Sequence, residues 1–159
     1  MLADDFAPHL TPAELAVLAS SVASMRPVVV ISAVPARLVE LRSTIDSRRV
    51  EVMLRELVVL VRRSLRGTDA VALAGDELLL MVDGPMVVAQ PIAARLLAAV
   101  RTHRFTGGVT DQPIRVTLSV GAAAAPEHGG NFDQLVRAAR RAQAEAGLDN
   151  SLSSDLSIA

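Results

Sequence analysis

Residues 65–82 read LRGTDAVALAGDELLLMV. Two apolar runs, Ala70–Leu73 and Leu78–Val82, flank the short segment Ala74-Gly75-Asp76-Glu77. Runs of this length on either side of a Gly-Asp pair are typical of two antiparallel strands joined by a tight turn. We therefore expect a β-hairpin here, and the elements on either side of it indicate the kind of domain that contains it.

A buried strand and a long helical region precede the hairpin. Val28-Val29-Val30-Ile31 is a continuous apolar run rich in β-branched residues, which predicts a central strand buried on both faces. From Pro35 to about Leu65, apolar residues recur at every third or fourth position. This spacing predicts a helix in two pieces, broken near Asp46-Ser47.

Residues 1–26 are expected to contain an N-terminal helix. Thr11 can act as its N-cap, Pro12 suits the first helical position, and Glu14 completes a capping box. This helix either packs on its own domain or acts as a dimerising stalk. Its apolar stripe is too short for a sustained heptad, which favours packing on its own domain.

Three more elements are expected after the hairpin. A helix runs to about Phe105 and is kinked or started at Pro91. Residues 114–120 alternate apolar and polar side chains, which predicts a strand with one more polar face. A last helix covers residues 132–147, and the tail 151–159 is expected to be flexible. The whole order predicts an α/β protein of the α+β type, with a central mixed sheet flanked by helices.

The composition excludes several classes of protein. All 16 basic residues are arginine and the chain has no cysteine. This excludes Gly-Lys phosphate loops, Schiff-base enzymes, disulfides and cysteine-based metal sites. With no Trp or Tyr and a net charge of −1, we expect no nucleic-acid partner. The chain shows no targeting signal and no apolar run near the ~20 residues of a membrane span, so we expect a cytoplasmic protein without a membrane partner.

Two strings, taken in order with the expected elements, resemble the GGDEF domain, the diguanylate cyclase module that condenses two GTP into cyclic di-GMP. The first is residues 65–82, which is similar to the signature hairpin of that family. The second is VTLSVGAAAAPEHGGNFDQLVRAA, residues 116–139, which is similar to a strand, loop and helix of the family. The resemblance implies a nucleotidyl-cyclase-like sheet, and we assign residues 27–150 to this domain.

The resemblance also implies where active-site residues would lie, and here the sequence departs from the family. Ser32 and Val34 stand where the family has aspartates, the first of which helps to hold Mg²⁺. Glu40 and Leu41 stand at the guanine-reading Asn-Asp positions. Asp76 would be the only matching metal ligand. A hydroxyl and an isopropyl group supply no charge to neutralise a triphosphate.

The signature itself is altered. Ala74-Gly75-Asp76-Glu77-Leu78 stands for Gly-Gly-Asp-Glu-Phe, and the stretch between Asp69 and Ala74 is one residue shorter than usual. Gln143-Ala144-Glu145 occupies the region where the family has a tyrosine and a phosphate-binding lysine. We therefore expect a degenerate domain that is not an enzyme and has no catalytic residue, no metal and no cofactor, with residues 74–78 as a relic hairpin.

Arg66 and Asp69 match the Arg-x-x-Asp of the family's inhibitory site, where cyclic di-GMP docks. A guanidinium can fork onto phosphate or the guanine Hoogsteen edge, and a carboxylate can accept hydrogen bonds from guanine. The alternative is that Arg66 ends a helix and Asp69 caps the entry to the hairpin. Likewise, Arg137, Arg140 and Arg141 either clamp an anion or form a solvated helix face.

These observations leave two main functions open. The first is a signalling module that binds cyclic di-GMP or a related nucleotide through Arg66 and Asp69. The second is a nucleotide-independent module for dimerisation or protein interaction in a bacterial signalling system. An active diguanylate cyclase is a third alternative. The expected partners are therefore cyclic di-GMP, a partner protein and a second copy of the chain.

Overall fold

A computed structural model of the chain describes residues 7–109, 111–149 and 157–158, with side chains for all of these except 146–149 and 157–158. Its elements, in chain order, are β1 (His9–Leu10), α1 (Pro12–Ala23), β2 (Val28–Pro35), α2 (Leu38–Thr44), α3 (Ser47–Ser64), β3 (Ala70–Ala74), β4 (Glu77–Asp83), η2 (Met86–Val88), α4 (Ala89–Thr102), β5 (Leu118–Ala125), α5 (Phe132–Asp149) and β6 (Ser157–Ile158).

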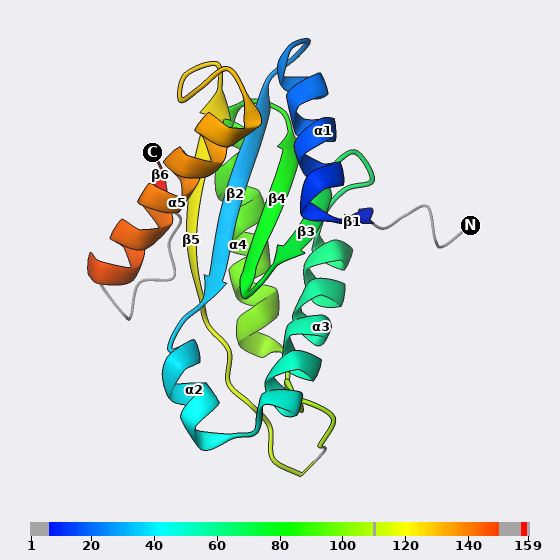
Figure 1. The fold of residues 1–159 in the computed structure, drawn as a ribbon, viewed down its shortest axis with the longest axis vertical. Coiled ribbons are helices and arrows are strands. Elements are labelled where there is room, and N and C mark those ends of the chain that lie inside the picture. The colour runs from blue at the N-terminus through cyan, green and yellow to red at the C-terminus, as the bar shows by residue number, and fades with distance from the viewer. Residues whose placement is uncertain (1–6, 110, 150–156, 159) are drawn as a thin grey trace.

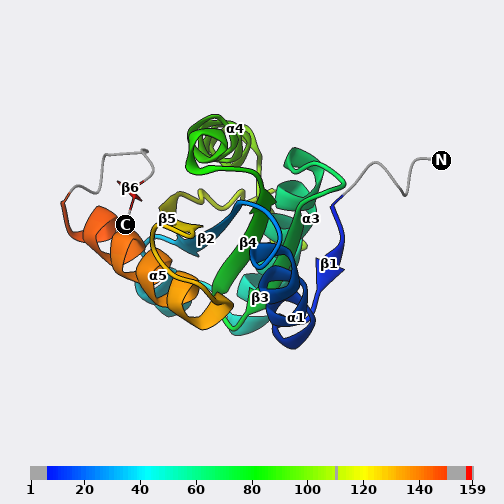
Figure 2. The same ribbon diagram turned by 90° about the horizontal axis from the view of Figure 1, so that it is seen from above.

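The strands form one six-stranded mixed sheet in the order β1-β3-β4-β2-β5-β6. The four inner strands are antiparallel to their neighbours among themselves, whereas β1 and β6 pair parallel at the two edges. Helices α3 and α4 cover one face of the sheet, and α1 and α5 cover the other (Figure 2). The short helix α2 lies at the end of the sheet where β2 ends and the β3–β4 hairpin turns (Figure 1). The predicted mixed α/β architecture is confirmed.

Strand β2 is the centre of the fold, as predicted. It pairs with β4 on one side and β5 on the other. Val29 and Ile31 belong to the apolar core under α3 and α4, whereas Val28 and Val30 belong to the core under α1 and α5. A continuous apolar run fits this position because successive side chains point to opposite faces and both faces are buried.

Helix α1 begins at the predicted cap. The Thr11 hydroxyl accepts the Glu14 N–H at 3.2 Å, and the Glu14 carboxylate accepts the Thr11 N–H at 3.3 Å. On its inner face Leu15, Ala19 and Val22 are buried in the core shared with α5. The helix therefore packs on its own domain.

The helical region after β2 breaks where predicted. Helix α3 starts at Ser47, and the Asp46 carboxylate caps it by accepting the Arg49 N–H at 2.9 Å. The hairpin is also confirmed, with Ala74 and Glu77 as its last cross-strand pair.

The expected helix near Phe105 ends earlier than predicted. Helix α4 ends at Thr102, and Phe105 lies beyond it, fully buried and bridged to Ile114. Helix α4 begins at Ala89, two residues before Pro91, so Pro91 lies in the first turn, where a backbone N–H has no partner within the helix.

The strand expected at residues 114–120 is displaced. Strand β5 runs from Leu118 to Ala125, because β2, with which it pairs, ends at Pro35 opposite Leu118. In the preceding stretch Ile114 is buried and Arg115 is exposed, so buried and exposed side chains do alternate there. It describes an extended segment that is bridged to the rest of the fold rather than a strand of the sheet.

Helix α5 lies unusually close to β5. A Cβ atom added at Gly121 would lie 2.2 Å from the Gln143 nitrogen and 2.4 Å from the Ala139 carbonyl oxygen, so only glycine permits this approach. The helix continues to Asp149, two residues beyond the expected end. Most of the tail expected to be flexible lies outside the described residues, but its Ser157–Ile158 forms β6 and pairs with β5, which corrects that expectation there.

No helix in the described part of the chain is both long and apolar enough to span a membrane.

Candidate functional site

The β3–β4 hairpin carries the site residues at its two ends. We call the end with Asp76 and Glu77 the turn end, and the end where Asp69 and Asp83 flank the two strands the open end. Five cross-strand pairs, from Ala70 opposite Met81 to Ala74 opposite Glu77, separate them.

At the turn end, two residues connect the strands. Gly75 has a φ of 64° and occupies the first central position of this loop, as in two-residue hairpin turns of type II′. Ala74 is the last residue of β3, and its φ does not lie in the left-handed region. Alanine is therefore tolerated at the first position of the signature because the unusual φ falls on Gly75.

Glu77 is the centre of a hydrogen-bond network that joins three elements. The Ser32 hydroxyl of β2 donates to Glu77 Oε2 at 2.7 Å. Arg140 of α5 binds the same carboxylate in a bidentate way, from Nη2 to Oε1 at 2.7 Å and from Nε to Oε2 at 2.9 Å. The hydrogen bonds to Glu77 raise the pKa of the Arg140 guanidinium, although burial acts in the opposite direction. The Ser32 side chain is buried, so the hydroxyl is matched to the carboxylate away from water.

The other acidic residue of the turn end is also paired. Arg42, in the last turn of α2, forms an ion pair with Asp76. Both side chains are about 40% exposed, at 39% and 44%, so water screens this pair more than the Glu77 network. Both carboxylates of the turn thus face guanidinium groups.

The segment that joins β2 to α2 contains one backbone outlier. Arg37 has a φ of 58°, in the left-handed region, although it is not glycine. After it, Leu41 packs against the core under α3 and α4, and Glu40 is exposed on α2. The structure therefore uses Leu41 for packing, and the two residues at the guanine-reading positions do not lie side by side in one environment.

The residues at the turn end do not fit a magnesium site. Ser32 donates its hydroxyl to Glu77, Val34 has no donor atom, and both carboxylates hold arginines. Within the described ranges, no group of three or more His, Cys, Asp or Glu side chains is arranged to hold a metal ion. Magnesium prefers several hard oxygen ligands. Here the carboxylate oxygens of Asp76 and Glu77 bind guanidinium groups instead.

At the open end, Asp69 ties the two strands together. Its side chain is fully buried, and its carboxylate accepts the Arg66 backbone N–H at 3.0 Å and the Asp83 backbone N–H at 3.0 Å. These contacts give Asp69 the capping role that was the alternative to ligand binding. A carboxylate in this position is not available on the surface.

Arg66 is held by Asp69 but remains half-exposed. Its Nε lies 3.3 Å from Asp69 Oδ2, and its Nη2 donates to the Asp83 carbonyl oxygen at 2.8 Å. The side chain is 48% exposed, and in the described part of the chain no hydrogen bond uses its Nη1. Beside it, Arg26 pairs with the Asp83 carboxylate at 3.0 Å. The structure therefore brings Arg66 and Asp69 together, with Nε and Nη2 of the guanidinium engaged and Nη1 left to face water.

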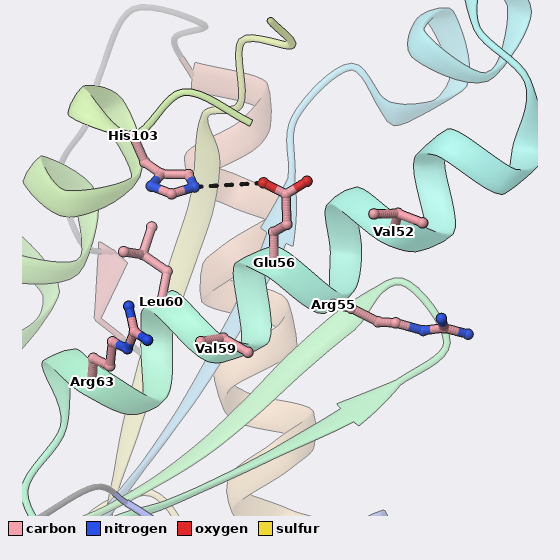
Figure 3. Close-up of a pocket in the computed structure, with 7 residues that line it drawn as sticks. All are labelled: Val52, Arg55, Glu56, Val59, Leu60, Arg63 and His103. Atoms are coloured by element: carbon pink, nitrogen blue, oxygen red, sulfur yellow. Dashed lines mark ion pairs between the residues drawn. The ribbon is translucent and has the colours of Figure 1, made fainter. Parts of the chain in front are cut away.

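Cavities also lie away from the hairpin, two of them beside α3 and α5. One, of about 400 Å³, follows α3 and is shown in Figure 3, with His103 pointing across it to Glu56. The other, of about 690 Å³, lies beside the loop between β5 and α5 and is lined by His128, Gly129, Gln134, Arg137 and Arg141. Of the three arginines expected to act together on α5, two face this cavity, whereas Arg140 turns to Glu77.

Sequence reasoning did not find the partners of the turn end. Arg42 lies 34 residues from Asp76 and Arg140 lies 63 residues from Glu77. No local spacing signals such pairs. Only the charges of Asp76 and Glu77 could have indicated such partners, because partly buried carboxylates are stable only when cationic groups lie nearby.

The sequence and the fold were also compared with known proteins. The model of the family described as "Diguanylate cyclase, GGDEF domain" matches residues 41–151. No curated protein matches the sequence. The crystal structure of the GGDEF domain of YfiN (TpbB) from Pseudomonas aeruginosa is similar, with 21% identity, a TM-score of 0.84 and 96% of each chain covered.

Two further solved structures share the fold. The active GGEEF domain of a diguanylate cyclase from Vibrio cholerae is 13% identical, with a TM-score of 0.80, and the match covers 93% of this chain and 96% of that one. The coiled coil and GGDEF domain of DgcB from Caulobacter crescentus, in complex with c-di-GMP, is 12% identical, with a TM-score of 0.76 and coverage of 92% and 78%.

The family match corrects one expectation. We expected a chain that is not an enzyme, but the matching model describes diguanylate cyclases, and one similar structure is an active domain of that kind. The altered residues at the turn end therefore do not remove the chain from a family of enzymes.

Proposed function

Because the chain belongs to the GGDEF family of diguanylate cyclase domains, we propose that it is a signalling module that binds cyclic di-GMP. The proposed domain spans residues 27–150, preceded by residues 1–26 with α1. Arg66 is the proposed contact to the nucleotide, and Asp69 is the residue that positions it. The signature region is proposed to be degenerate, in the sense that its residues have been replaced around the turn end.

The observation that carries this proposal is the state of Arg66. A fully buried carboxylate holds its guanidinium in one place, and half of the side chain still faces water. A guanidinium fixed in this way loses little conformational entropy when it binds, and its Nη1 can donate a charge-assisted hydrogen bond to phosphate or to the guanine Hoogsteen edge. The buried Asp69 leaves ligand contact to Arg66.

The turn end supports the proposal that the signature region has changed its chemistry. Ser32 is a donor to Glu77 and Arg140 neutralises the same carboxylate, so the substitutions fit one another. An aspartate at position 32 would place two carboxylates together, whereas a serine satisfies the hydrogen-bonding capacity of Glu77. DgcB was solved in complex with c-di-GMP, which makes this nucleotide the first ligand to test.

Titration calorimetry of the whole chain with cyclic di-GMP tests the proposal. Arg66→Ala is expected to weaken binding by about tenfold or more, because a hydrogen bond to a charged group contributes about 1.5–3 kcal/mol. Arg48→Ala is the matched control: Arg48 is exposed near the start of α3, whereas Arg66 follows the end of that helix. The control should bind cyclic di-GMP like the unchanged chain.

Absence of heat at about 100 µM cyclic di-GMP, together with an unchanged melting temperature, contradicts the proposal, because a ligand at ~100 times its Kd stabilises a protein by about 2.7 kcal/mol. An equal loss of binding in Arg48→Ala would also contradict it, since the effect would then reflect net charge alone.

One observation favours a second candidate function, protein interaction without a nucleotide. The cavity along α3 is lined by apolar and charged side chains, namely Val52, Val59, Leu60, Arg55, Glu56, Arg63 and His103 (Figure 3), and Val59 is 42% exposed. An amphipathic helix of a partner protein matches a groove of this kind, with its apolar face on Val59. Crosslinking of Val59→Cys to a partner, with no effect of cyclic di-GMP on the yield, is the result expected for this function.

A further inference from the structure

A third cavity, of about 450 Å³, lies between the end of α4 and the extended segment that leads into β5. Three arginines line it: Arg101 and Arg104 from the α4 end, and Arg115 from the extended segment. No aspartate or glutamate is among its lining residues. We call this cavity the arginine pocket.

These three arginines differ from the other well-placed arginines of the fold. Arg42, Arg66 and Arg140 each bind a carboxylate. Within the described residues, Arg101, Arg104 and Arg115 make no side-chain hydrogen bond or ion pair. The chain has 17 acidic residues for 16 basic ones, and none of the acidic side chains lines this cavity. Their mutual repulsion is relieved when an anion lies between them.

The walls of the pocket are fixed by the fold. Ile114 and Val116 are buried beneath it, and Ile114 donates its N–H to the Phe105 carbonyl. On the other side the Thr117 carbonyl accepts the Ala36 N–H at 2.8 Å, which attaches the segment to the end of β2. The guanidiniums therefore project from a backbone that is already ordered, so binding need not order it.

His103 also lines the pocket but is turned toward a different group. Its Nε2 lies 3.6 Å from Glu56 Oε2 (Figure 3). Its ring and the ring of Phe105 form an edge-to-face pair with 4.5 Å between the ring centroids. This leaves the arginines as the groups that would bind an anion. Two threonines, Thr102 and Thr117, complete the polar lining.

We propose that the arginine pocket binds a small molecule that carries at least two phosphate groups. Its volume lies within the ~300–1,000 Å³ of ordinary small-molecule sites. A guanidinium presents two parallel N–H groups to a phosphate, and three guanidiniums from two segments supply enough donors for two phosphates. None of the lining residues belongs to the turn end or the open end of the hairpin, so this site is independent of the proposed cyclic di-GMP contact at Arg66.

Titration calorimetry of the whole chain with inorganic pyrophosphate, at about 50 mM salt, tests the site. Pyrophosphate is expected to bind at least tenfold more tightly than orthophosphate. Arg104→Gln and Arg115→Gln, taken separately, are each expected to weaken pyrophosphate binding by about tenfold, the effect of one charge-assisted hydrogen bond. Arg95→Gln is the matched control, because Arg95 is exposed on the same helix α4 and lies outside the pocket.

The result that supports the site is a loss in both pocket variants with unchanged affinity in Arg95→Gln. An equal loss in all three variants overturns it, since the attraction would then be a property of net charge. Equal affinity for orthophosphate and pyrophosphate, or no heat up to about 10 mM pyrophosphate, also overturns it. Arg66→Ala should leave pyrophosphate affinity unchanged, which separates this result from the test with cyclic di-GMP.

Discussion

The open end and the turn end of the β3–β4 hairpin use the same pair of groups, a carboxylate and a guanidinium, in different surroundings. At the open end Asp69 is fully buried and binds mainly backbone N–H groups. At the turn end Asp76 and Glu77 bind guanidiniums that are partly exposed. Burial decides the role in each case: the first carboxylate joins two strands, and the other two link helices to the turn.

The difference can be measured because the cost of removing a partner rises with burial. A buried group left without its partner loses its hydrogen bond and cannot recover it from water. An exposed pair contributes about 0–1 kcal/mol, since water and salt replace the interaction. The two ends should therefore respond to substitution with different magnitudes, and four variants rank them.

Asp69→Ala should have the largest effect, a loss of about 3 kcal/mol in the free energy of unfolding measured by urea denaturation. The variant removes a fully buried carboxylate and leaves the part-buried N–H groups of Arg66 and Asp83 without their acceptor. Asp46→Ala is the control: Asp46 also accepts a backbone N–H but at an exposed helix cap, for which about 1 kcal/mol is expected. Equal losses in the two variants would show that burial does not distinguish them.

Ser32→Asp should come next, with a loss of about 1–2 kcal/mol at neutral pH, because the introduced carboxyl group faces Glu77. The repulsion raises the pKa of the introduced group in the folded state above its unfolded value. The loss is therefore present at neutral pH and disappears as pH falls toward about 4.

The uncharged variant Ser32→Asn is the control for Ser32→Asp and should show no such dependence on pH beyond that of the unchanged chain. If Ser32→Asp is as stable as Ser32→Asn at pH 7, Arg140 neutralises both carboxylates and the repulsion argument is wrong.

Arg140→Gln should cost up to about 1 kcal/mol, because its bidentate contact is half-exposed. The cost should shrink in 1 M salt, where the screening length is about 3 Å. Arg141→Gln removes the same charge from the next residue of α5 without touching Glu77, and its melting temperature should stay within one degree of the parent. A cost that is independent of salt would point to lost packing instead.

Arg42→Gln should have the smallest effect, below about 0.5 kcal/mol, because both members of its pair are well exposed. Thermal unfolding at low salt is the sensitive measurement. A loss larger than that of Arg140→Gln would reverse the ranking of the two contacts and would show that α2 depends on this pair for its position.

The open end was accessible from the sequence because its interaction is local. Arg66 and Asp69 are three residues apart at the end of a helix, and capping by an aspartate at such a junction is a known local pattern. The turn end was not accessible, since its partners come from α2 and α5 and depend on how the sheet brings them together. Whether a segment forms a helix or a strand was predictable for the same reason as the open end, because the spacing of hydrophobic residues is a local property of the sequence.

Boundaries that depend on a partner were predicted less well. Residues 114–117 alternate like a strand, but whether they join the sheet depends on the length of β2. Gly121 gave no sign of its role, because the close approach of α5 is a tertiary contact between residues that are 18 or more apart in the chain. A spacing pattern describes one segment and carries no information about the segment packed against it.

The two-residue strands β1 and β6 lie at the two edges of the sheet. An edge strand offers unpaired N–H and C=O groups to any other chain, and long flat edges lead to aggregation. Within the described residues, β1 pairs with β3 at two positions and β6 pairs with β5 at two positions. Strands β2 and β4 are thus paired on both sides, whereas most of the eight-residue strand β5 has no strand partner on its outward side in that part of the chain, and strand addition would take place there.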